Sequence, residues 1–543
     1  MDTLDGYVMN TLDGYVMNTL AGTGALVRLI LRRDRLRLAI WIGALVVVTL
    51  ATAAALAKLV PTAESRALFA AGITGNPSII ALVGPMFDAT TIGGLLAWRM
   101  GGTGSVLVAL MSLLTVVRHT RAEEEAGRRE LLGSAGVGRH AALAAALLVT
   151  GSADLLVAVL VAAGLIACGL PVAGAVAMGL SFASVGWIFA AIAAVAAQLV
   201  ESARAANGIA GATLGAAYLA RTVGDAGLGG MAWLSWASPI GWSQRVRPFA
   251  GERWWICAFA AAVAAVLAAA AHALSARRDL GTGIVPPRSG PATASRRLSG
   301  ALGLAWRLQR GTLFGWTIAF AVVGAALGGV AQGLAELLNS SPRLRMMVAT
   351  FAGQAGIVDA YFASVLGILG LAASGYAVQA TLRLRSEEEE ARAEPVLATP
   401  VSRLRWATSH LIFAALGPAI ALVTAGITAG FAHGGRGDVG RLIAAALVQL
   451  PAVWVLVGIT LALFGLAPRF ARASWGVLAA GVLLGQLGPL LRLAPWVMNL
   501  SPFTHVPRLP GGVFEAAPLL VLLGVAALLA IAGLLGWQRR DVG

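Results

Sequence analysis

Long apolar runs constrain the fold of this chain more than any other feature of its sequence. The hydrocarbon core of a bilayer is about 30 Å thick, so a helix needs about 20 mainly apolar residues to cross it. Runs of this kind recur along the whole chain. The membrane spans that we expect lie at 38–60, 91–117, 141–168, 172–200, 207–222, 254–276, 311–331, 359–382, 409–430, 442–466, 473–492 and 516–537.

Composition supports this interpretation. Hydrophobic residues make up 58% of the chain and charged residues only 12%, against roughly 25% charged residues in a soluble domain. Such a chain is neither a soluble globular protein nor a disordered one. We predict an all-α integral membrane protein with about twelve transmembrane helices, of which 207–222 and 473–492 are the weakest because they are short and Gly-rich.

The basic residues indicate how the helices are oriented. A net charge of +15 could attract nucleic acid, but most of the arginines lie beside the apolar runs. A cytoplasmic N-terminus places 27 of the 40 Lys and Arg residues on the cytoplasmic side, in agreement with the positive-inside rule. We therefore predict a multi-pass protein of the cell membrane with both termini in the cytoplasm and no nucleic-acid partner.

The chain is a tandem duplication. The segment from Arg121 to Arg139 (RAEEEAGRRELLGSAGVGR) matches that from Arg385 to Arg403 (RSEEEEARAEPVLATPVSR) at a constant offset of 264 residues. Because each half has an even number of helices, the two halves are parallel, as in other transporters built from repeats. We predict a disordered leader with a repeated octapeptide, a first six-helix half, a cytoplasmic linker and a second six-helix half, at 1–24, 25–276, 277–300 and 301–543.

Each half carries a short acidic segment between its second and third spans. Glu124 and Arg128, like Glu125 and Arg129, have the i,i+4 spacing that stabilises a helix through ion pairs. A solvated charged helix would explain one such segment. Its repetition at the same topological place favours a docking element for a partner with two-fold symmetry.

The acidic loops, the six-plus-six layout and the Ser-Pro pair before each last helix resemble ABC exporter permeases, in particular actinobacterial permeases of the polyketide-antibiotic (tetronasin-type) exporters. The Arg-rich, nearly Lys-free composition is also typical of a high-GC genome. The resemblance implies that the acidic segments are coupling helices that bind a groove of a separate ATPase homodimer. The implied docking residues are Glu123, Glu124, Glu125, Arg128, Glu130, Glu387, Glu388, Glu389, Arg392 and Glu394.

The ATPase that the resemblance implies must lie on another chain. A P-loop requires lysine in the pattern GxxxxGK[ST], and the only lysine, Lys58, is followed by Leu59. The six histidines lack metal-ligand spacing, so we expect no metal site. We expect a transport permease rather than an enzyme, with no cofactor bound by this chain and with ATP and Mg on the partner ATPase. Its other expected partners are membrane lipid and a hydrophobic small-molecule substrate.

Two charged residues fall inside expected spans, where charge is costly. Arg99 and Asp154 are expected to pair across the bundle; the alternative is a polar contact in a substrate or proton pathway.

Aromatic residues gather before the last span of the first half. There the sequence suggests either an aromatic belt or short re-entrant segments, which the resemblance implies would form an outer gate. The candidates, including the matching pair in the second half, are Trp233, Trp236, Pro239, Trp242, Pro502 and Phe503.

The sequence thus favours the permease of an ATP-driven exporter of hydrophobic or amphipathic compounds, which would give antibiotic resistance by multidrug efflux. The alternative is a proton-coupled secondary drug transporter. Paired buried carboxylates, which such a transporter commonly uses, are not evident, and the duplicated acidic segments would be unexplained.

Overall fold

The computed structural model describes residues 19–71, 77–129, 137–225, 228–286, 300–340, 354–487 and 494–540, with the single positions 293 and 298. Within these ranges every regular element is a helix. The chain divides into two compact units, Met1–Gly290 and Pro291–Gly543, which are described separately below. The predicted docking residue Glu130 and most of the predicted leader lie outside the described residues.

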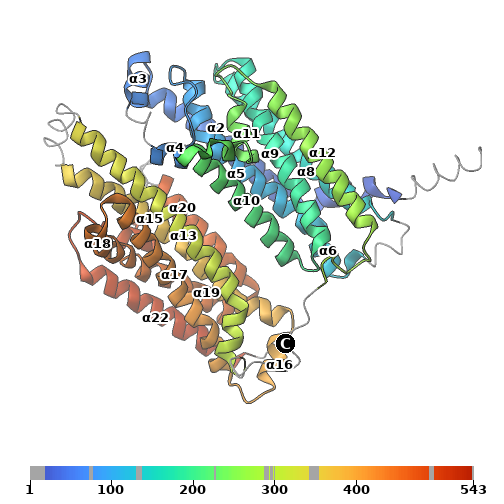
Figure 1. Cartoon of the computed structure of the whole chain (residues 1–543). Coiled ribbons are helices and arrows are strands. Elements are labelled where there is room, and N and C mark those ends of the chain that lie inside the picture. Colours follow the sequence, from blue (N-terminus) through green and yellow to red (C-terminus); the bar gives the residue numbers. More distant parts are fainter. Residues whose placement is uncertain are drawn as a thin grey trace, which may run out of the picture. The chain divides into compact units, whose positions relative to one another are not determined.

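The first unit is a bundle of long helices with short ones between them (Figure 1). Its elements are α2 (Thr23–Leu59), α3 (Ala63–Ala71), α4 (Pro77–Val83), α5 (Ile92–His119), α6 (Arg121–Glu125), α8 (Ala141–Ala167), α9 (Val172–Leu199), α10 (Ala203–Asp225), η1 (Leu228–Ser235), α11 (Pro239–Arg245) and α12 (Trp254–Ala276).

The second unit has a similar order of long helices. Its elements are α13 (Ala301–Ser340), α15 (Gln354–Glu389), α16 (Ala393–Leu397), α17 (Arg403–His433), α18 (Arg436–Leu447), α19 (Leu450–Leu466), η3 (Pro468–Ala473), α20 (Ser474–Leu487), α21 (Pro495–Met498), η4 (Pro502–His505) and α22 (Ala516–Arg539).

Ten helical segments of the described chain are long and apolar enough to cross a membrane, with α18 and α19 counted together. They match ten of the twelve spans expected from the sequence. The other two expected spans are the weak ones. The first forms α10, whose ends carry Arg204, Arg221 and Asp225, and the second forms α20, described over 14 residues. The integral membrane character is confirmed, whereas the count of twelve remains a prediction.

Close helix packing in the first unit depends on glycine. The helices α5 and α9 are the most buried, and α2 and α12 are mostly exposed; α8, α9 and α12 run side by side (Figure 1). A Cβ atom at Gly104 of α5 would lie 2.3 Å from the Phe182 ring of α9, and one at Gly179 would lie 2.3 Å from the Ala158 carbonyl of α8. Small residues at helix contacts are the usual basis of packing in membranes, where lipid is as apolar as the side chains.

The second unit repeats this arrangement. The helices α15 and α19 are largely buried, whereas α13 and α22 are mostly exposed. Gly328 of α13 approaches the Ala429 carbonyl of α17, and Gly465 of α19 approaches Gly533 of α22, so closely that neither contact has room for a Cβ atom. The second and fourth long helices of each unit therefore form its centre.

Candidate functional site: the duplicated acidic segments

In the first unit, the acidic segment is held by Glu124. This residue lies in α6, directly after α5, and its carboxylate is buried. Arg278 donates to both of its oxygens, at 2.6 Å and 2.8 Å, and the backbone N–H of Gly281 donates at 2.7 Å. Arg121 and Arg129 lie 3.0 Å and 3.4 Å from the same carboxylate. Glu124 thus ties α6 to the start of the segment that leaves α12.

In the second unit, the acidic segment comprises the last turn of α15 and the start of α16, and ion pairs hold it in the same way. Arg540 donates to Glu388 at 2.6 Å, and Arg385 lies 3.0 Å from the other oxygen. Glu387 is also buried, 2.6 Å from Arg383 and 3.1 Å from Arg392. Arg540 directly follows α22, just as Arg278 closely follows α12.

The two segments agree in detail. Arg128 donates from Nε to Glu123 at 2.7 Å, and Arg392, 264 residues later, donates from Nε to Glu387 at 3.1 Å. The hydrogen bond raises the pKa of Arg128. Burial lowers the pKa of Arg392, but its contacts with Glu387 and Glu390 outweigh burial and raise it overall.

The backbone geometry and a further arginine are repeated as well. Gly127 has φ +70° and Ala391, its equivalent, has φ +53°. Arg139 donates to the carbonyl of Arg278, and Arg403 donates to that of Arg540. A sequence repeat is therefore also a repeat of contacts.

The prediction that Glu124 pairs with Arg128, and Glu125 with Arg129, is wrong. Glu123 binds Arg128 and Glu124 binds Arg129, each five residues apart. The reason is the backbone: α6 ends at Glu125, and the left-handed Gly127 alters the path of the chain before the arginines. Glu125 instead accepts a hydrogen bond from the Ala203 N–H at the start of α10.

The remaining predicted docking residues are more accessible. Glu125, Arg128, Glu389, Arg392 and Glu394 are exposed. Glu389 forms an ion pair with Arg472, in the short η3 helix that precedes α20. Each acidic segment thus has buried carboxylates that hold it to its own unit and exposed charges on its outer surface.

Arg99 and Asp154 are not paired, so that expectation is wrong. Asp154 of α8 is fully buried and accepts a hydrogen bond from Ser112 of α5 at 2.7 Å. Arg99 is exposed. It precedes Ser112 by 13 residues in the same helix, which corresponds to about 20 Å along the axis. The two charges therefore lie at different depths in the bundle.

At the end of the first unit away from α6, the aromatic candidates form a packed cap. Ser238 caps α11, which begins at Pro239. Trp242 donates to the Trp236 carbonyl at 2.6 Å, and the Trp236 ring stacks on Trp255 with 6.1 Å between ring centroids. Trp233 lies in η1 and is exposed.

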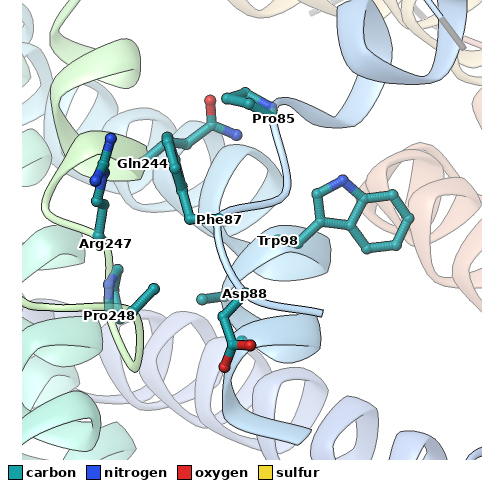
Figure 2. A pocket seen from close by; sticks show the side chains of 10 residues that line it. Pro85, Phe87, Asp88, Trp98, Gln244, Arg247 and Pro248 are labelled. Atoms are coloured by element: carbon teal, nitrogen blue, oxygen red, sulfur yellow. The ribbon is translucent and has the colours of Figure 1, made fainter. Parts of the chain in front are cut away.

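Next to this cap, the segment before α5 meets the chain after α11 (Figure 2). Arg247 lies over the Phe87 ring at 4.5 Å, and Gln244 donates to the Val83 carbonyl at 2.7 Å. Asp88 accepts hydrogen bonds from Thr90 and Thr91; although burial opposes the effect, these bonds hold the pKa of Asp88 below its usual value. The pocket between these groups has a volume of about 10 Å³, enough for roughly one water molecule. Little free space is left between these groups.

In the second unit, Pro502 begins the short helix η4 and Phe503 packs beside α19 and α22. Phe503 lines a much larger cavity of about 850 Å³. The stack of Trp236 on Trp255 thus has no counterpart in the described part of the second unit.

Sequence reasoning missed four arginines at the acidic segments: Arg139, Arg278, Arg403 and Arg540. Their signal was present, because the first and third are identical at the 264-residue offset and the other two end matching Arg-Arg pairs. It also missed Ser112, for which the sequence carries no repeated counterpart that would single it out.

Comparison with known proteins agrees with this architecture. Residues 298–538 match the family described as "Multidrug efflux system permease Rv1217c, C-terminal domain". The chain is also 44% identical over 528 residues to the multidrug efflux system permease protein Rv1217c of Mycobacterium tuberculosis (strain ATCC 25618 / H37Rv), which covers 96% of this chain and 95% of that protein. This chain therefore belongs to the family of multidrug efflux system permeases and is a multi-pass membrane protein with a role in transport.

Proposed function

We propose that this chain is the transmembrane permease of an ATP-driven ABC exporter, with both termini in the cytoplasm. A separate homodimeric ATPase binds ATP and Mg²⁺, and the permease moves hydrophobic or amphipathic compounds out of the cell. The multidrug efflux assigned to the relative from Mycobacterium tuberculosis supports export. The resemblance to polyketide-antibiotic exporters supports antibiotics as cargo.

One observation carries the proposal: the ion pair between Glu124 and Arg278 recurs between Glu388 and Arg540. Two equivalent acidic segments on one chain suit a partner made of two identical subunits. A single permease chain would then provide both docking sites.

The same ion pairs suit the transmission of force. Arg278 closely follows α12 and Arg540 directly follows α22, the last long helix of each unit. A docking helix held only by solvent-exposed charges would be weakly coupled to the membrane, because exposed ion pairs contribute little. A buried pair joins movement of the acidic segment to movement of the last helix.

Docking itself would use the exposed charges. Glu125 lies on the surface of the first segment and Glu394 on that of the second. We expect them to contact basic residues of the ATPase. Charges on the rim of an interface mainly affect the rate and specificity of association.

Charge reversal tests this role. Glu125→Lys with Glu394→Lys should reduce the ATPase that co-purifies with the permease by about tenfold and abolish ATP-dependent efflux. Glu64→Lys, at an exposed site in α3, is the matched control and should change neither. Unaltered co-purification and efflux in the double variant, with its thermal stability preserved, would refute the docking role.

Asp154 favours the alternative of a proton-coupled secondary transporter. It is fully buried, and its Oδ2 atom has no hydrogen-bond partner among the described residues. Intramembrane carboxylates commonly serve as proton relays. Efflux that persists without ATP and collapses with a protonophore would favour this second function.

A further inference from the structure

The second unit contains a large cavity between α19, α20, α22 and the segment that holds η4. Its volume is about 850 Å³, within the range of about 300–1,000 Å³ that is typical of small-molecule sites. Most of its wall is apolar, with side chains such as Leu478, Leu484, Phe503 and Val525.

One polar group in this wall is unsatisfied. Ser501 is only 2% exposed, and its hydroxyl has no hydrogen-bond partner among the described residues. Its equivalent in the first unit, Ser238, donates to the Ala217 carbonyl at 2.6 Å and accepts from the Gly241 N–H at 3.3 Å. Buried polar groups are almost always paired, so the Ser501 hydroxyl in the cavity wall can bind a polar group of a ligand.

The sequence differs between the two units at this place. An offset of 263 residues aligns Ser238 with Ser501, and it aligns Trp236 and Trp242 with Asn499 and His505. In the first unit, the Trp242 ring packs on Phe259 of α12 with 4.9 Å between ring centroids. His505 keeps the contact that Trp242 makes with the Trp236 carbonyl, with 3.0 Å between its Nε2 and the Asn499 carbonyl, but its ring is smaller. His505, which lines the cavity, therefore fills less space than the Trp242 ring does in the first unit.

The charge at the cavity suggests the class of ligand. Glu515 lines it and is exposed, and none of the described lining residues is Arg or Lys. Glu515 also has no ion-pair partner in the described part of the chain. An anionic phospholipid headgroup would be repelled here, whereas a cation would be attracted.

We propose that this cavity binds an amphipathic organic cation, whose apolar body lies among α19, α20 and α22. Its polar end meets the Ser501 hydroxyl and the Glu515 carboxylate. The assignment of this ligand as transported cargo rests on the proposed export function; the binding site itself does not.

The test is fluorescence titration of the purified full-length protein in nanodiscs with rhodamine 6G, a lipophilic cation that carries hydrogen-bonding groups. Ala480→Trp, which adds bulk to the cavity wall, should weaken binding at least tenfold. Ser501→Ala should weaken it about threefold to tenfold, and Glu515→Gln should weaken it by a similar factor. Ile318→Trp, on an exposed face of α13, and Glu64→Gln should leave binding within twofold of wild type.

Unchanged affinity in both Ala480→Trp and Ser501→Ala would overturn the proposal. So would displacement of the probe by phosphatidylglycerol together with equally tight binding of the anion 8-anilinonaphthalene-1-sulfonate, because lipid would then be the occupant. Binding is measured without the ATPase, so the two proposals fail separately. Normal rhodamine binding with no ATPase partner contradicts only the export function. ATPase coupling with unaltered binding in both Ala480→Trp and Ser501→Ala contradicts only this site.

Discussion

Arg278 binds both carboxylate oxygens of Glu124, at 2.6 Å and 2.8 Å, across 154 residues of sequence. Both side chains are buried. Removal of Arg278 leaves Glu124 its contacts with Arg121 and Arg129 but deletes buried hydrogen bonds to a charged group, which are typically worth about 1.5–3 kcal/mol. We therefore predict that Arg278→Ala lowers the free energy of unfolding by about this amount.

Thermal or detergent unfolding of the purified protein measures this effect. Arg277→Ala is the control, since Arg277 is the exposed neighbour of Arg278. Equal stability of the two variants would show that the ion pair does not hold α6 in place.

The left-handed turn gives a second prediction. Ala391 has φ +53°, where an L-residue with a Cβ atom is strained by roughly 1–2 kcal/mol. Its equivalent, Gly127, has φ +70° without that strain. We expect Ala391→Gly to raise the free energy of unfolding by about 1 kcal/mol and Gly127→Ala to lower it by a similar amount. Detergent unfolding of both variants measures these changes. If the free energy of unfolding changed in the same direction in both, the two turns would not be equivalent.

Prediction from sequence succeeded where the signal was periodic or repeated. Ten expected spans formed long apolar helices, and the offset of 264 correctly matched Glu124 with Glu388. The repeated Arg-Arg pair marked Arg278, but its pairing with Glu124 was out of reach, because that contact depends on how α12 packs against α9. The pairing of Arg99 with Asp154 failed because opposite charge says nothing about depth along a helix.

Asp154 separates the two transport mechanisms. Asp154→Asn retains the size of the side chain and can still accept the hydrogen bond from Ser112. If ATP drives export, this variant should retain ATP-dependent efflux within about twofold, because no proton needs to pass. Its loss of all efflux, while ATP hydrolysis by the partner continues, would favour proton coupling. Ser112→Ala controls for the loss of the hydrogen bond alone.

Asp88 gives a prediction for pH. Its folded-state pKa is lowered, so its contribution to stability is present above the unfolded pKa of about 3.9 and is lost as pH falls through the lower folded value. The stability difference between wild type and Asp88→Asn should be constant near neutral pH and shrink below about pH 4. Melting temperatures measured from pH 7 to pH 3 check this; a difference that grows in acid would contradict it.

The central claim is that one duplicated permease chain provides two docking sites for an ATPase homodimer. Native mass spectrometry of the permease co-expressed with its ATPase tests this claim most directly. We predict a complex of one permease chain with two ATPase subunits, whose amount falls about tenfold in Glu125→Lys with Glu394→Lys. A permease that carries no ATPase, or that carries a single ATPase subunit per chain, would contradict the account.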